Sequence, residues 1–381
     1  MSLILKLIAG ILVGIAAGFY LPMALVELLY TAKVIIGQLI SFTIPLIILF
    51  FIASGIAGLP KGSGHLLGKT VGFAYGSTVI AGTLAVILVN AFIPFFDGAL
   101  SYEASSATEI GSYINVEIPP LMGVMTALAT AFIFGIGISQ LNLTTLKEVT
   151  DQGRVVIDGL LSKVIIPALP FYIAGVFAEM AVAGTVADTL STFGIVLVAA
   201  IVMHWLWLTV LYVGTGILLK RSPFELIKNM LPAYFTAIGT MSSAATIPVS
   251  LRSSKANGVK EEVANFSVPL CATIHLSGST ITIVTCAMAV MLLSPSMAVP
   301  SLVQMLPFIF MLGVVMIAAP GAPGGAVMSA LGLLTSMLGF NEAAVALMIA
   351  LYLAQDSFGT ACNVTGDGVI ALWVNRFSQR A

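Results

Sequence analysis

Charged residues are scarce in this chain of 381 residues, where Lys, Arg, Asp and Glu together make up 8%. Soluble domains contain about 25% charged residues. Apolar residues account for 59% of the chain, and the mean hydropathy is +1.10. A protein with so few polar side chains cannot cover its surface for water, so we expect a lipid bilayer to surround it.

Two further scarcities exclude other classes of protein. The net charge is only −1, so no basic surface suggests a nucleic-acid partner. The three cysteines (Cys271, Cys286 and Cys362) all lie in apolar stretches without metal-site spacing, which argues against a disulfide framework. The composition therefore predicts an integral membrane protein, with no nucleic acid among its partners and no organic cofactor.

Long apolar runs are abundant, and eight of them are long enough to cross a membrane. We place these spans at 3–22, 33–58, 67–95, 121–139, 155–179, 192–219, 262–292 and 342–374. Two more apolar stretches, 226–252 and 302–338, are interrupted, the first by Pro248 among small hydroxylated residues and the second by PGAPGG. We expect both to be hairpins that dip into the membrane from opposite faces. The predicted fold class is an all-α integral membrane protein with eight transmembrane helices and two re-entrant helical hairpins.

Basic residues predict the orientation of these spans. If the N-terminus is cytoplasmic, all of the 15 Lys and Arg residues except Lys33 and Lys163 fall on the cytoplasmic side. The loop 96–120, placed outside, holds acidic residues and no basic one. We therefore expect a multi-pass protein of the plasma membrane, a prokaryotic inner membrane, with both termini in the cytoplasm.

Residues 355–373 of the last span carry two carboxylates, Asp356 and Asp367, and no Lys or Arg. Intramembrane carboxylates are costly and usually mark the path of an ion or a substrate. Asn363 and Asp367 are spaced to share one helix face, and the residues between them have turn character that suits local unwinding. Freed carbonyls and one carboxylate would suit a hard cation such as Na⁺. An ordinary helix cap is the alternative, which the apolar residues after Asp367 disfavour.

The span 262–292 is interrupted as well, by Pro269, Gly278 and a polar set that includes His275. Hydroxyls in a membrane helix often bond only to the backbone one turn back, and His275 is as readily a structural histidine as a proton site. Broken backbone at membrane depth is tolerated only where protein buries it or it lines a cavity. Paired broken segments are the usual sign of a transporter's substrate site.

The order of these motifs is specific. A serine-rich hairpin with SSAATIP, a broken span, a second hairpin with PGAPGG and a last span with NVTGD resemble the dicarboxylate/amino acid:cation symporter family. The resemblance covers essentially the whole chain. It implies an elevator-type transporter that assembles as a homotrimer. It also implies a scaffold made of residues 1–66 and 96–190, and a mobile transport domain made of residues 67–95 and 191–381.

The resemblance also implies site residues. Asp356 falls where the family binds the substrate's α-amino group, and Ser243 and Asn363 fall where it holds the α-carboxylate. The other residues that it places at the substrate are Ser242, Ser279, Gly321, Ala322, Gly324, Gly359 and Thr360, of which Gly321, Ala322 and Gly324 form the gate at the tip of the second hairpin. One Na⁺ site is implied at Asp367 with the carbonyls of Cys271, His275 and Asn363. Another is implied at Thr273 with carbonyls near Ile317 and Ala319.

Departures from the family pattern suggest the substrate. Members that carry acidic substrates have an arginine at the position of Gly359, and some relatives have one at the position of Met241. A substrate carboxylate buried without that charge is costly, so we expect a neutral amino acid. We also expect Gly359 to widen the pocket. The family's Asn-Met-Asp-Gly-Thr is replaced here by His275-Leu276-Ser277-Gly278-Ser279, which removes a carboxylate ligand. We therefore expect two coupled Na⁺, with His275 as a candidate site for a coupled proton.

Three alternatives remain open. A transporter of this kind could instead carry a dicarboxylate or another organic anion that lacks an α-amino group. An intramembrane aspartyl protease needs two carboxylates about 3 Å apart, whereas the spacing along one helix separates Asp356 and Asp367 by roughly 16 Å. A channel would fit the membrane location, although gate-like hairpins favour alternating access.

Overall fold

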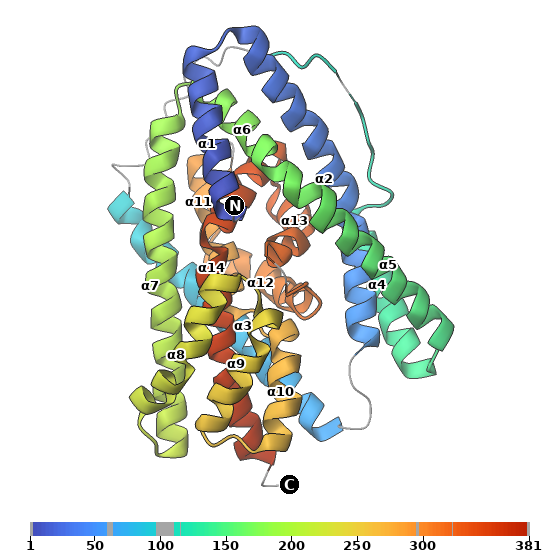
Figure 1. The fold of residues 1–381 in the computed structure, drawn as a ribbon, viewed down its shortest axis with the longest axis vertical. Coiled ribbons are helices and arrows are strands. Elements are labelled where there is room, and N and C mark those ends of the chain that lie inside the picture. The colour runs from blue at the N-terminus through green and yellow to red at the C-terminus, as the bar shows by residue number, and fades with distance from the viewer. Residues whose placement is uncertain are drawn as a thin grey trace.

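The computed structural model describes residues 3–58, 64–96, 110–114, 116–294, 297–321 and 323–378. The regular secondary structure of these residues is helical throughout, and α2 and α7 run along the long axis of the molecule (Figure 1). The helices are α1 (Leu3–Tyr20), α2 (Met23–Ala57), α3 (Gly64–Phe96), α4 (Val124–Leu141), α5 (Thr144–Leu160), the π-helical turn η1 (Leu161–Ile165), α6 (Ile166–Val182), α7 (Val186–Leu219), α8 (Pro223–Thr240), α9 (Ser243–Ala256), α10 (Glu261–Ile274), α11 (Ser277–Leu293), α12 (Leu302–Met316), α13 (Gly325–Leu338) and α14 (Glu342–Ser378).

Seven helical segments of the described chain are long and apolar enough to cross a membrane, and they match the predicted spans from 33–58 onward. The largest departure is the segment Thr144–Val182, which is one helical segment where we expected a loop up to residue 154. Charged side chains do not end the helix there, because Lys147 and Asp151 lie one turn apart and form an ion pair of 2.7 Å at the surface.

Each of the two interrupted stretches is a pair of helices in mutual contact. α8 and α9 are separated at Met241, which has a positive φ of 51°, and Ser242, whose side chain caps α9. The predicted break at Pro248 is wrong, because Pro248 lies inside α9, whose contacts with α10 and α14 hold the helix despite the backbone bond that proline removes. α12 and α13 are separated as the Pro and Gly residues predict, and Gly324 has the positive φ of 74° that favours glycine.

The span 262–292 is broken as expected, between α10 and α11, where His275 has extended backbone. By contrast, α14 is continuous from Glu342 to Ser378, so the predicted unwinding around Asn363 is wrong. The turn-forming residues of this segment are buried against α10 and α11. That packing outweighs their local preference for a turn.

The helices pack in two groups that share one boundary. α14 contacts α7, α8, α9, α10 and α11, while α2 contacts α4, α5 and α6, and α1 packs on α6. In Figure 1 the second group lies above and to the right of the first. α13 contacts α2 and α4 and so joins the two groups. In the most apolar stretch of each span, 94% of the residues are buried inside the protein for α10–α11 and 89% for α14, against 28% for α4. The centre of the molecule therefore lies in the first group.

Candidate functional site

Asp356 on α14 holds the linker between α12 and α13. Its Oδ2 accepts a hydrogen bond of 2.6 Å from the backbone N–H of Gly324, and its side chain is buried. A charged acceptor makes this a strong hydrogen bond. Gly324 begins α13 with a left-handed conformation, which turns its N–H toward α14. The carboxylate and the linker therefore form one connected unit.

Asn363 on α14 caps the start of α11. Its Oδ1 accepts hydrogen bonds from the backbone N–H groups of Gly278 (2.7 Å) and Ser279 (3.1 Å), and its Nδ2 donates to Ser279 Oγ at 2.8 Å. These N–H groups have no partner within α11, because the first donors of any helix lack one. The break after His275 thus exposes backbone donors at the point where Asn363 and Ser279 meet.

The two linkers also touch each other. Ser242, between α8 and α9, donates a hydrogen bond of 2.9 Å to the backbone oxygen of Gly321, between α12 and α13. The bond joins residues 79 positions apart in the chain. The tips of the two helix pairs therefore meet beside α14.

A small cavity of about 10 Å³ lies at this meeting point, between α11, α14 and the two linkers. Its lining includes six of the residues predicted at the substrate: Ser243, Ser279, Gly321, Asp356, Thr360 and Asn363. Met241, Leu276, Pro320, Ala326 and Tyr352 complete it. The volume is no more than one water molecule occupies, so an amino acid would fit only after the surrounding elements move apart. The sequence analysis did not predict Tyr352 at this site. Its position one helical turn before Asp356 is the signal that could have indicated it.

Of the four other residues predicted at the substrate, Ser242 and Gly324 stand in the two linkers, and Gly359 lies between α11 and α14. A Cβ on Gly359 would lie 3.1 Å from Thr282 Oγ1 of α11, so Gly359 faces the α11–α14 contact and does not widen the cavity. That expectation is corrected: Gly359 allows close packing of two helices. Ala322 lies outside the described residues.

Asp367 contacts a buried histidine. His275 Nδ1 lies 2.9 Å from Asp367 Oδ1, and His275 Nε2 lies 2.9 Å from Ser77 Oγ of α3. All three side chains are buried. A Cβ on Gly366 would lie 2.7 Å from His275 Cε1, so this glycine makes room for the ring. Sequence reasoning placed His275 and Asp367 together but missed Ser77, since a serine in an apolar span carries no distinct signal.

Cys271 and His275 are two of the residues predicted to offer carbonyls to a cation at Asp367. Cys271 and His275 stand at the end of α10, which packs on α14, and the carbonyl of Cys271 accepts a hydrogen bond of 2.8 Å from the N–H of His275. No three His, Cys, Asp or Glu side chains converge as a metal site within the described part of the chain. A hard cation at Asp367 would therefore take its other ligands from carbonyls and hydroxyls, as Na⁺ does.

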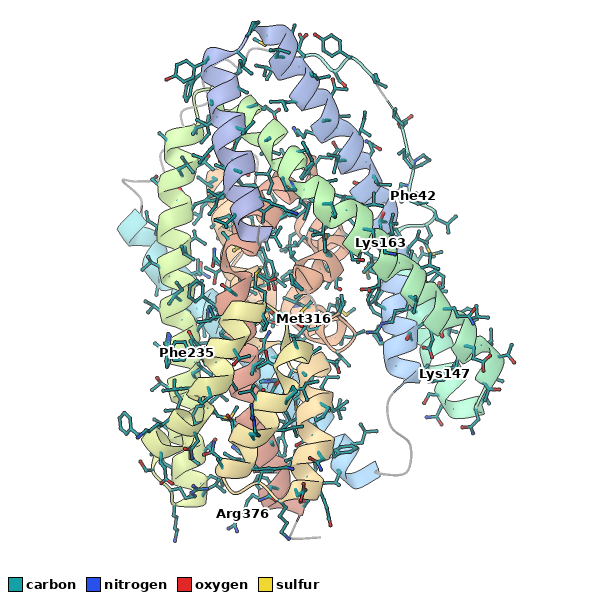
Figure 2. All side chains as sticks on the ribbon, in the orientation of Figure 1. Phe42, Lys147, Lys163, Phe235, Met316 and Arg376 are labelled. Atoms are coloured by element: carbon teal, nitrogen blue, oxygen red, sulfur yellow. The ribbon has the colours of Figure 1, made fainter. Side chains whose placement is uncertain are left out.

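The second predicted cation site borders a larger cavity of about 410 Å³. Thr273, Ile317 and Ala319 line one side of it, and the opposite side comes from α2 and α5, with Asp151 and Arg154. Figure 2 labels Met316, just before the linker, and Lys147, which also lines this cavity from α5. Thr273 Oγ1 donates to the carbonyl of Leu270 at 2.8 Å. The residues predicted for this site are thus brought together at the boundary between the two groups of helices.

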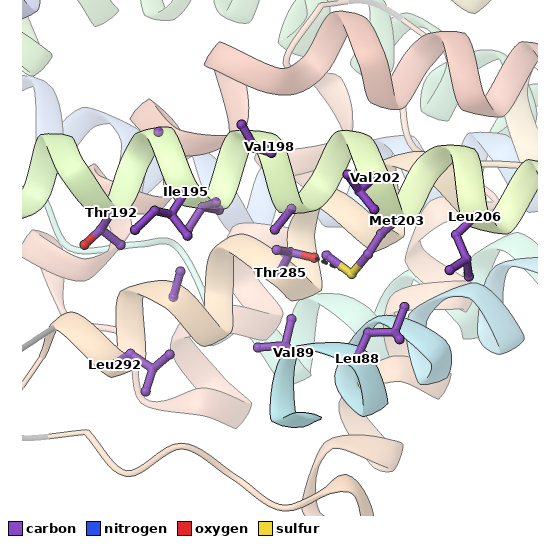
Figure 3. Close-up of a pocket in the computed structure, with 14 residues that line it drawn as sticks. Leu88, Val89, Thr192, Ile195, Val198, Val202, Met203, Leu206, Thr285 and Leu292 are labelled. Atoms are coloured by element: carbon purple, nitrogen blue, oxygen red, sulfur yellow. Dashed lines mark hydrogen bonds between the residues drawn. The ribbon is translucent and has the colours of Figure 1, made fainter. Parts of the chain in front are cut away.

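An apolar cavity of about 570 Å³ lies between α3, α7 and α11 (Figure 3). Its labelled lining residues, among them Val198, Val202 and Leu292, are aliphatic apart from two threonines and Met203. None of the predicted site residues borders it. It offers no charged group to a polar solute.

The geometry contradicts the aspartyl protease alternative. Asp356 and Asp367 stand on one continuous helix, which separates them by roughly 16 Å, and each has its own partner. An aspartyl dyad needs carboxylates about 3 Å apart. Ser77, His275 and Asp367 have the order of a hydrolytic triad, but the serine is only 4% exposed and is closed in by protein.

Buried carboxylates at the meeting point of broken membrane helices define the class of secondary transporters. Comparison with known proteins agrees, since residues 3–377 match the model of the sodium:dicarboxylate symporter family. The chain belongs to this family. Its members are transporters and not enzymes.

Individual relatives are distant. The chain is 25% identical to a serine/threonine transporter SstT of Acinetobacter baumannii (strain AYE), with 96% of this chain and 94% of the relative aligned. It is 25% identical to the protein of the same name from Lacticaseibacillus casei (strain BL23), over 74% of this chain and 67% of the relative. It is also 26% identical to human excitatory amino acid transporter 1, over 74% of this chain and 53% of the relative.

Proposed function

We propose that this protein is a secondary active transporter that carries a neutral amino acid together with Na⁺. The observation that carries the proposal is the small cavity at Asp356, where α11, α14 and both linkers meet around a buried carboxylate. A buried carboxylate without a cation is costly, and the α-ammonium of an amino acid supplies one. Asp356 would bind that ammonium, and Ser243 and Asn363 would hold the α-carboxylate.

The lining of the cavity supports a neutral side chain on the substrate. Asp356 is the one carboxylic acid, and no Lys or Arg is present, among the described lining residues. A second substrate carboxylate would be buried there without a counter-charge. Relatives named serine/threonine transporters support the same class. The human relative, named an excitatory amino acid transporter, supports amino acids more broadly.

The cation sites follow from the same geometry. Na⁺ at Asp367 would share α14 with the substrate, and Na⁺ at Thr273 would share the linker that carries Gly321 and Gly324. Because the linker borders both sites, it would close fully only when both ligands are present, and this common gate would couple them. Two Na⁺ per substrate, and a proton role for His275, stay predictions.

We extend the proposal to the whole chain. It has eight transmembrane helices, with α8–α9 and α12–α13 as re-entrant hairpins that enter from opposite faces. Residues 1–66 and 96–190 form a scaffold that assembles as a homotrimer, and residues 67–95 and 191–381 move through the membrane as an elevator. Both termini face the cytoplasm of a prokaryotic cell. The boundary at which α13 meets α2 and α4 supports this division.

Counterflow of labelled solutes into liposomes tests the proposed function. We expect at least one neutral amino acid to exchange in a Na⁺ gradient, and glutamate and succinate to exchange poorly. The family name favours a second candidate, a dicarboxylate substrate. Exchange of dicarboxylates without any neutral amino acid would establish that candidate and refute ours. Accumulation without a Na⁺ gradient would refute the coupling.

A further inference from the structure

Met241, at the tip of the α8–α9 pair, combines a long side chain with a backbone conformation that disfavours one. Its φ of 51° is left-handed, which glycine adopts freely and other residues adopt only at a cost. Its N–H donates a hydrogen bond of 2.8 Å to the carbonyl of Ala237 and so closes α8, at a position where glycine is common. Of the three non-glycine residues with positive φ in the described ranges, Asn142 and Lys220 are exposed and Met241 is buried.

A strained residue of this kind is kept only where its side chain has a use. Such residues cluster at ligand sites, where the strain is part of the function. Met241 lines the cavity at Asp356, together with Leu276, Pro320 and Ala326. These four residues, the apolar set, are all buried and come from four segments: the α8–α9 linker, the break before α11, the α12–α13 linker and the start of α13. One part of the cavity lining is therefore apolar.

The polar residues of the same lining are engaged with one another. The hydroxyls of Tyr352 and Thr360 interact with the carboxylate of Asp356. Ser279 bonds to the amide of Asn363 at 2.8 Å. The proposed function assigns that carboxylate and that amide to the charged ends of an amino acid. The apolar set is then what the lining offers to the side chain of the substrate.

We propose that the apolar set contacts the side chain of the substrate, with Met241 as its adjustable member, and selects small aliphatic amino acids, the class of alanine and valine. The inference rests on the proposed function, because it needs an amino acid whose charged ends are held by Asp356 and Asn363. The cavity of about 10 Å³ must open to admit such a ligand. The unbranched thioether of methionine fills irregular gaps and readily changes its shape, which suits a wall that moves.

The chemistry of the apolar set disfavours a hydroxyl on the substrate. Its side chains offer no hydrogen-bond donor and one weak acceptor, the sulfur of Met241. Burial of a hydroxyl without a good partner is unfavourable, whereas a buried methyl group is stabilising. A substrate side chain that ends in methyl groups therefore fits this part of the cavity better than one that ends in a hydroxyl.

Valine and threonine test the inference directly, because they have nearly the same shape and differ by a methyl group in place of a hydroxyl. Dissociation constants for both are measured by calorimetry in saturating Na⁺. For the unaltered protein we expect valine to bind about tenfold more tightly than threonine. A preference for valine below about threefold, or a preference for threonine, would overturn the inference.

Substitutions at Met241 test whether this residue sets the preference. Met241→Gln keeps a side chain of similar length and adds an amide that can pair with a hydroxyl, so the preference for valine over threonine should fall at least about fivefold. Met241→Leu stays apolar and should keep the preference within about twofold. Met311→Gln is the matched control, since it makes the same change in a partly buried methionine of α12 outside the cavity, and it should leave the preference unchanged.

Met241→Gly tests the same contact in a variant whose backbone suits the positive φ. Without the thioether, the advantage of valine over alanine should fall at least about fourfold, the value of one buried methylene group. An unaltered preference in Met241→Gln, or in Met241→Gly if the first variant does not fold, would overturn the role of Met241. If the unaltered protein binds neutral amino acids without favouring aliphatic ones, only the inference fails. If it binds no neutral amino acid, the proposed function fails and the inference with it.

Discussion

Replacement of Asp356 by asparagine removes one charge from the centre of the cavity and almost no volume. The amide oxygen of Asp356→Asn can still accept the hydrogen bond from Gly324, so the contact between α14 and the linker should persist. The variant loses the charge that would face the substrate ammonium. Removing one partner of a buried, hydrogen-bonded charge pair costs about 2–5 kcal/mol.

The lower end of that range already corresponds to a loss of about thirtyfold in affinity. Calorimetric titration with the preferred neutral amino acid in saturating Na⁺ should detect it. Na⁺ alone should stabilise the variant in a thermal-shift assay as it stabilises the unaltered protein, because Asp367 and its partner His275 are untouched. Glu342→Gln is the control, since it removes an exposed carboxylate from the same helix. An affinity within about threefold of the unaltered protein, or equal loss of Na⁺ and amino acid, would refute the role of Asp356.

Three further substitutions test the packing around the site. Alanine in Gly324→Ala must adopt a left-handed conformation that costs roughly 1–2 kcal/mol, and its Cβ would lie 3.0 Å from Leu353 Cδ2. We therefore expect the affinity for substrate to fall in calorimetry. An unchanged affinity would mean that the linker does not close over the ligand. Gly359→Arg should lower the melting temperature without admitting glutamate, because the glycine packs against Thr282; counterflow of glutamate by a stable variant would restore Gly359 to the pocket. Asn363→Ala leaves two N–H groups of α11 without their acceptor and should destabilise the fold by about 1–3 kcal/mol in denaturant titration, and a smaller effect would show that water replaces the amide.

The spans from 33–58 onward were predictable because length and hydropathy determine which segments can cross a bilayer. The sequence predicts a loop up to residue 154, whereas the structure has a helix there, on one face of which Lys147 and Asp151 pair. The turn-forming residues around Asn363 predict a break, whereas burial against α10 and α11 keeps α14 continuous. Contacts between helices decide the second case, and a short window of sequence does not contain them.

The site was predictable only in part. The residues of PGAPGG and NVTGD mark positions at which the chain must break or carry charge, and the structure brings Gly321, Asp356 and Asn363 together. The orientation of Gly359 and the contact between Ser77 and His275, which are 198 residues apart, depend on how α3, α11 and α14 pack. The spacing of residues along one helix does not predict such contacts between different helices.

One measurement addresses most directly whether solute and cation share a gate. The dissociation constant of the preferred neutral amino acid is determined by calorimetry at a series of Na⁺ concentrations, with choline as the replacement cation. Common closure of the linker between α12 and α13 predicts that the amino acid binds more tightly as Na⁺ rises, and that the amino acid tightens Na⁺ binding by the same factor. A dissociation constant that stays constant across the series would contradict a shared gate.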